Sequence, residues 1–169
     1  MPDICDLILE GHETFRRHFA ELDDLRAAGA GRDAFAREWK PVADLLEVHA
    51  ASEEELFYPR LLPRGDDAEE ETRDAIGDHN DIRDAVRRAT EREVGSDEWW
   101  NAVLDAREQN SDHMAEEERG AIPDFRAHAE GSLREDLGVH WLRFQAEHAE
   151  ARGIDLADKD PDRYVARHG

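Results

Sequence analysis

Apolar residues recur three or four positions apart along almost the whole chain of 169 residues, and no segment alternates as a β-strand would. This spacing predicts an all-α protein. Four long helices are expected over residues 3–28, 33–59 and 69–93 and from Ser96 or Asp97 onward. Because the expected connections are short, these helices should form an antiparallel up-and-down four-helix bundle.

Two further features shape the expected outline of the chain. Pro41 should kink the second helix or mark its true start, because proline lacks a backbone donor. An appended C-terminal helix is expected over residues 132–152, where apolar residues again share one face. The polar remainder should be loosely held. We therefore expect one domain over residues 1–152, the bundle with its fifth helix, and a polar C-terminal tail over residues 153–169.

Acidic residues dominate the charge of the chain, with 43 acidic against 22 basic residues and a formal net charge of −21. Binding a phosphate backbone or an anionic membrane requires clustered lysine and arginine, so neither nucleic acid nor a membrane is an expected partner. Cys5 is the only cysteine, which excludes an intrachain disulfide. Together with the lack of a basic, apolar leader or a long apolar run, this favours a cytoplasmic location.

An internal repeat links the two halves of the chain. The segments that begin at His49 and at His113 both carry Glu four and five residues after the His, and Pro ten residues after it. Upstream of these segments, His12 and His79 are each followed at the third position by an apolar residue. Each half therefore predicts a helical hairpin, with one His on its first helix and a His-x-x-x-Glu pair on its second.

The repeated residues are in phase with the apolar faces of their helices. This phase places six polar side chains inside the expected bundle: His12, His49, Glu53, His79, His113 and Glu117. A buried carboxylate needs a partner, and no arginine is evident on the same helix faces. Four imidazoles and two carboxylates suit a pair of first-row transition metals, each bound by two histidines, with both carboxylates bridging. Iron, manganese and zinc are all admissible, and a solvent-derived bridge would leave positions open for a small molecule.

Alternatives to this ligand set remain open at this point. A single histidine on an apolar face is more often a hydrogen-bonded core residue, but the matched halves favour a metal site. Glu54 and Glu118 could replace their neighbours as bridges, and are otherwise solvated residues beside the ligands. The fifth helix or a phenolate could add a ligand, the candidates being His140, His148, Tyr58 and Tyr164. The other histidines are expected on the surface or in the tail: His18, His128 and His168.

The repeated pattern resembles the hemerythrin-like family of His-His-Glu cation-binding bundles, over about residues 4 to 125. This resemblance implies a non-haem centre of two iron ions with an oxo or hydroxo bridge. It also implies small-molecule partners: dioxygen, hydrogen peroxide or nitric oxide. The chain departs from the oxygen carriers of the family at two places. Arg83 stands where they have a further His. Their final carboxylate is commonly an Asp five residues after the last His, whereas here Glu117 stands at four residues and Glu118 at five.

The missing histidine argues against reversible oxygen carriage, because a carrier needs one iron saturated and only the other open. Two accessible metals instead favour an oxidoreductase that consumes peroxide, as a catalase does, or nitric oxide. A module that senses or stores oxygen, nitric oxide or iron without turnover is the alternative. A ferritin-like oxidase is disfavoured, because none of the nine histidines has Glu three residues before it. A metal-free structural bundle would leave the buried His/Glu pairs without a physical account.

Overall fold

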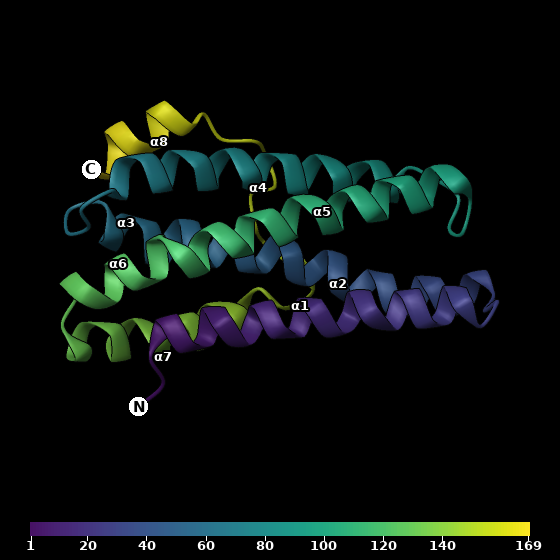
Figure 1. The fold of residues 1–169 in the computed structure, drawn as a ribbon, viewed down its shortest axis with the longest axis horizontal. Coiled ribbons are helices and arrows are strands. Elements are labelled where there is room, and N and C mark those ends of the chain that lie inside the picture. The colour runs from purple at the N-terminus through teal and green to yellow at the C-terminus, as the bar shows by residue number, and fades with distance from the viewer.

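The computed structural model describes all 169 residues and contains helices but no strand, so the prediction of an all-α fold is confirmed. Successive long helices run in opposite directions along a common axis (Figure 1). They are α1 (Ile4–Ala27), α2 (Arg32–Ser52), α4 (Ala68–Thr90) and α5 (Asp97–Arg119). None of the helices is both long and apolar enough to span a bilayer.

The helix starts follow from local capping chemistry. The Asp3 side chain accepts a hydrogen bond from the backbone N–H of Cys5 at the start of α1. The Ser96 hydroxyl accepts one from Trp99 at the start of α5, as the sequence predicts. Pro41 does not mark a start, because it lies in the interior of α2. Pro41 is exposed, and so is Arg37, whose carbonyl loses its helical donor; water can therefore hydrate that carbonyl, which makes the proline tolerable.

The expected second helix is interrupted by a π-helical turn over Glu53–Phe57, which joins α2 to the short helix α3 (Tyr58–Leu61). A π-helical turn inserts one residue and rotates the side chains that follow. Here it leaves both Glu53 and Glu54 buried. The turn therefore begins at a residue that the sequence singled out as a metal ligand.

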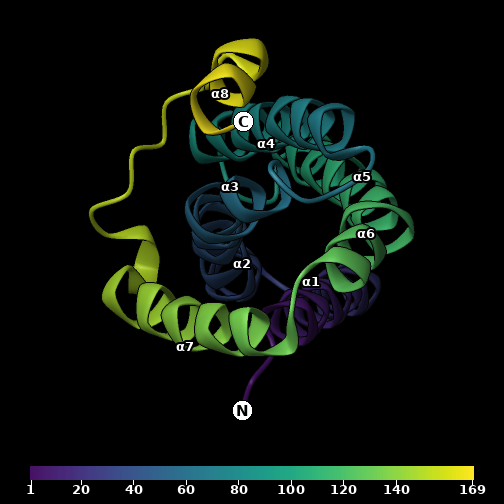
Figure 2. The same ribbon diagram turned by 90° about the vertical axis from the view of Figure 1, so that its left-hand side faces the viewer.

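The C-terminal third of the chain contains the expected appended helix, α7, but also two helices that were not expected, α6 and α8. After α5 the chain forms α6 (Ala121–His128), then α7 (Gly131–Glu147), a 3-10 turn over Ala149–Ala151, and α8 (Pro161–His168). Helix α7 packs beside α1 and α2, whereas α8 crosses to the opposite side and packs on α4 (Figure 2). Residues 153–169 are not loosely held, because Asp160 caps α8 and the side chains of Tyr164 and Val165 are buried.

The core consists of two apolar clusters with a polar layer between them. On α1, Ile8 belongs to one cluster and Phe15 to the other, and His12 lies between the two. On α4, Ile76 and Ile82 stand on the two sides of His79 in the same way. The apolar layers thus hold the polar side chains in place and keep bulk water away from them.

Candidate metal centre

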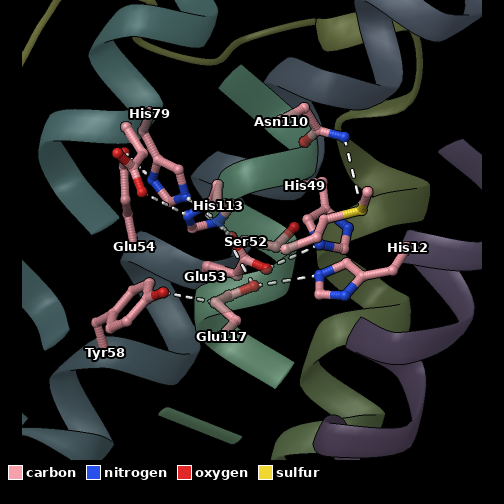
Figure 3. A network of polar contacts seen from close by, with 12 residues as sticks. His12, His49, Ser52, Glu53, Glu54, Tyr58, His79, Asn110, His113 and Glu117 are labelled. Atoms are coloured by element: carbon pink, nitrogen blue, oxygen red, sulfur yellow. Dashed lines mark hydrogen bonds and ion pairs between the residues drawn. The ribbon is translucent and has the colours of Figure 1, made fainter. Parts of the chain in front are cut away.

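The six predicted ligand residues meet in the polar layer at the middle of the bundle (Figure 3). Each long helix contributes, and the π-helical turn supplies Glu53. None of the six is more than 5% exposed: His12, His49, Glu53, His79, His113 and Glu117. Residues more than 100 positions apart in the sequence are therefore neighbours here, as His12 and Glu117 show.

Glu53 lies between two groups of histidines. Its Oε1 atom is 2.8 Å from Nε2 of His49, while its Oε2 atom is 3.0 Å from Nε2 of His79 and 3.6 Å from Nε2 of His113. Two overlapping sets of potential ligand atoms result, each within 4.8 Å: His12, His49 and Glu53, and Glu53, His79 and His113. The carboxylate shared by both sets is placed as a bridging ligand would be.

Glu117 also spans the two groups. Its Oε2 atom is 3.1 Å from Nε2 of His12 and 3.4 Å from Nε2 of His113. Its other oxygen, Oε1, accepts a hydrogen bond of 2.5 Å from the hydroxyl of Tyr58. Glu118, the alternative bridge, instead contacts the outward-facing Nδ1 of His12 at 2.9 Å. Of the two neighbours, Glu117 is the one that faces the centre.

Two buried atoms at the centre have no hydrogen-bond partner, namely Nε2 of His49 and Oε1 of Glu53. They lie 2.8 Å apart without the geometry of a hydrogen bond. An unpartnered buried polar atom costs about 1–3 kcal/mol, and a cation that accepts both lone pairs would remove this cost. Imidazole nitrogens and carboxylate oxygens are donors that iron, manganese and zinc all accept. The residues present therefore fit transition-metal cations.

Charge pairing inside the layer is strong even without a cation. Burial alone would raise the pKa of Glu53. The neighbouring histidines lower that pKa by more than burial raises it, so the pKa of Glu53 is well below the ordinary value. Burial lowers the pKa of His113, but the charge of Glu117 and hydrogen bonds to carboxylates hold it well above the ordinary value. A raised pKa favours the protonated form of His113 when no metal is bound, and a metal that binds there would replace that proton.

Three of the four histidines have a carboxylate on their outward-facing Nδ1 atom. Glu118 contacts His12 at 2.9 Å, Glu54 contacts His79 at 2.9 Å, and Asp78 contacts His113 at 3.3 Å. Such a partner fixes the tautomer that leaves Nε2 free for a metal and raises the basicity of the ring. Glu54 is therefore not a solvated residue beside the ligands; it is 5% exposed and forms part of the centre.

Arg83 is a buried partner that the sequence reasoning missed. Its side chain donates to Oε1 of Glu54 at 2.7 Å and lies 3.5 Å from Glu47. Burial raises the pKa of Glu54, but His79, Arg83 and Lys159 together lower it to about 2. Beside His12, Arg16 donates to Glu118 in the same way, at 2.7 Å.

The sequence carries a signal for these outer partners. In each half an Arg stands four residues after the first His, and a second Glu follows the ligand Glu. Residues four apart are neighbours on one face of a helix, so each Arg lies close enough to its His to contact the carboxylate on Nδ1. The internal repeat therefore extends from the predicted metal ligands to the residues that contact them.

His49 is the exception, because aromatic rings surround it in place of a carboxylate. The rings of Phe15 and Trp141 each lie 5.2 Å from its ring in edge-on contact. Trp141 is the contribution of α7 to the centre. The histidines of that region do not reach it: His140 is exposed, and His148 contacts the backbone carbonyl of Arg152 at 2.8 Å.

The two tyrosines do reach the surroundings of the centre, as hydrogen-bond donors. Tyr58 donates to Glu117, and Tyr164 donates to the backbone carbonyl of Glu54. Among the remaining histidines, His128 is exposed and His18 is half-buried against Glu38, at 2.6 Å.

An open cavity of about 350 Å³ leads from the surface to the centre and ends at Tyr58, His113 and Glu117. Acidic side chains line its outer part: Asp67, Glu70, Glu71, Asp74, Asp78 and Glu116. A cleft lined by one sign of charge attracts counterions and repels ions of its own sign. This cavity therefore favours cations and neutral molecules over anions.

Glu71, in the wall of this cavity, makes stability depend on pH. Burial and the nearby charges of Asp124 and Asp67 raise its pKa from 4.5 to about 7. The folded state thus binds this proton more tightly than the unfolded state does, and unfolding becomes easier as the pH rises between those values. We expect Glu71→Gln to match the unmodified protein near pH 4.5 and to melt at a higher temperature than it near pH 7.5. Thermal unfolding across this range measures the difference.

The exposed neighbour Glu69 supplies the matched control for that measurement. Glu69→Gln should show no gain in melting temperature that grows with pH. A constant difference between Glu71→Gln and the unmodified protein at every pH would contradict the assignment.

The sequence profile of the Hemerythrin HHE cation binding domain matches residues 3–125. This span runs from the start of α1 into α6 and contains all six central residues, whereas α7 and α8 lie beyond it. No curated protein and no solved structure matches the chain significantly. The family profile covers well over half of the chain. The chain therefore belongs to the hemerythrin HHE cation-binding family.

Proposed function

We propose that the protein holds a pair of iron ions between the six central residues and breaks down hydrogen peroxide there. The observation that carries this proposal is the position of Glu53 between two groups of histidines, beside a cavity that opens to the surface. His12 and His49 would hold one ion and His79 and His113 the other, with Glu53 and Glu117 shared. An oxo or hydroxo bridge would complete the pair; manganese or zinc fit the same donors.

Two adjacent iron ions would supply redox changes at neighbouring positions when they are bound. Peroxide breakdown suits such a pair because it balances without another reactant: one peroxide loses two electrons and two protons to become dioxygen, and a second takes them up to become two waters. Reduction of nitric oxide would in addition require an electron donor. For this reason peroxide is the preferred substrate and nitric oxide the second.

The residues of the chain support this assignment at the inner end of the cavity. Tyr58 lines the cavity and is fully buried. Burial and the charge of Glu117 raise the pKa of Tyr58 well above its ordinary value, so its hydroxyl keeps its proton. That proton is donated to Glu117, so the hydroxyl oxygen could accept a hydrogen bond from hydrogen peroxide. The acidic outer wall would admit dioxygen, peroxide or nitric oxide, which are neutral, and exclude anionic substrates.

Oxygen release from hydrogen peroxide tests the proposal directly. We expect the iron-loaded protein to release oxygen faster than the same concentration of free iron, and His113→Ala to lose this excess together with about half of its bound iron. His140→Ala, at an exposed position on α7, should retain both. Release no faster than that of free iron would refute the peroxide activity. Binding of zinc alone after attempted iron loading would exclude a redox function.

A sensor of oxygen, nitric oxide or iron is the second candidate, favoured by the contact of Lys159 with Glu54 at 2.8 Å. Through this contact, a change at His79 could reach the C-terminal residues. A sensor should show ligand-dependent protection of residues 153–169 from protease. Identical digestion with and without ligand would argue against it.

A further inference from the structure

The C-terminal segment, residues 153–169, lies beyond the family match and still reaches the metal centre. Nζ of Lys159 contacts Oε2 of Glu54 at 2.8 Å, and the hydroxyl of Tyr164 donates to the backbone carbonyl of Glu54. Glu54 in turn contacts Nδ1 of His79. Lys159 thus contacts Glu54, and Glu54 contacts His79, a predicted metal ligand.

The backbone of Lys159 is fixed by the residue next to that ligand. The amide of Asn80 donates to the carbonyl of Lys159 at 2.7 Å, and its oxygen accepts from the N–H of Lys159 at 2.9 Å. Asn80 follows His79 on α4. An ion pair between Arg73 and Asp162, at 2.7 Å, holds the segment on the same helix. Lys159 is therefore placed by several contacts and is not a freely moving surface lysine.

The two halves of the centre differ at this point. Beside His12, the carboxylate on Nδ1 is Glu118, which pairs with one cation, Arg16, in a half-exposed position. Beside His79, the carboxylate on Nδ1 is Glu54, whose two oxygens contact two cations, Arg83 and Lys159. The Glu54 side chain is 5% exposed, against 30% for Glu118, so water screens the cations of the second half less.

We propose that Lys159 is a positioning residue that neutralises and fixes Glu54, and so raises the reduction potential of the metal position beside His79. This inference rests on the metal pair of the proposed function. A carboxylate on Nδ1 makes a histidine a stronger donor to its metal. Two cations on Glu54 weaken that effect at His79, and their positive charge itself disfavours the oxidised metal. Both effects favour the reduced state at the position held by His79 and His113.

Lys159→Met tests this inference, because methionine keeps an unbranched side chain of similar length and removes the charge together with its N–H donors. Lys40→Met is the matched control: Lys40 is the only other lysine, and its contact is a surface pair with Asp44. Metal content is measured first, and then the reduction of the iron-loaded proteins is titrated. Mössbauer spectra of the same samples distinguish the two iron positions.

We expect Lys159→Met to bind as much iron as the unmodified protein and to shift the reduction equilibrium of one iron about tenfold toward the oxidised state. This shift corresponds to about 59 mV for a one-electron step. Lys159→Arg should restore the original value, and Lys40→Met should leave it unchanged. Full iron content with unchanged potentials and spectra in Lys159→Met would overturn the role of Lys159 alone. Failure of the unmodified protein to bind a metal pair would instead overturn the proposed function, and this inference with it.

Discussion

Replacing Glu53 with alanine is expected to abolish binding of both metal ions, a larger loss than removal of any single histidine should cause. Glu53 belongs to both sets of potential ligands, and its two oxygens contact histidines of both groups. Its removal would leave Glu117 as the only shared ligand and would take away the carboxylate that contacts three of the four imidazoles. Breaking a buried ion pair costs about 3–5 kcal/mol, so the metal-free variant should also unfold more easily.

Elemental analysis of the purified variant, together with its thermal unfolding, measures both effects. Glu55→Ala is the matched control, because Glu55 lies two residues further along the same π-helical turn and is exposed. We expect it to retain its metal and its melting temperature. Full metal content in Glu53→Ala would show that Glu53 is not shared between the two ions.

The fold and the meeting of the six central residues could be predicted because both depend on helical phase. His12 stands in phase with Ile8 and Phe15 along α1, and the same logic applies on the other three long helices. A helix that buries its apolar face must also bury a histidine on that face. Two matched halves then require the histidines to meet, whatever the details of the loops.

The outer partners could not be predicted in this way, for two physical reasons. Glu54 follows a ligand directly, and on a regular helix its side chain would point to a different face; the π-helical turn is what leaves both neighbours buried. Lys159 contacts Glu54 from a segment 105 positions away, and neither local periodicity nor composition specifies such a contact. The polar composition of residues 153–169 therefore suggests a loosely held tail. In the structure, the buried side chains of Tyr164 and Val165 fix it.

A second large effect is expected from a residue that carries no functional group. A Cβ atom at Gly11 would lie 2.5 Å from Cε1 and 2.7 Å from Nδ1 of His49. Phe15 and Trp141 pack against the same ring, so His49 has little room to move aside. Gly11→Ala should therefore push the His49 ring out of place or separate α1 from α2. Either outcome removes one ligand from the first group and leaves His79 and His113 in position.

We expect Gly11→Ala to bind about half the metal of the unmodified protein and to melt at a lower temperature, as elemental analysis and thermal unfolding would show. Gly77→Ala is the matched control, because Gly77 lies within α4 and, apart from its chain neighbours and the local helix backbone, nothing lies within 4 Å of its added Cβ. In that position alanine should stabilise the helix by about 0.5–1 kcal/mol and leave the metal content unchanged. Equal metal content in the two variants would mean that the ring of His49 is not a ligand. If only Gly11→Ala loses metal, the centre requires the close approach of α1 to the His49 ring, which only a residue without a side chain permits.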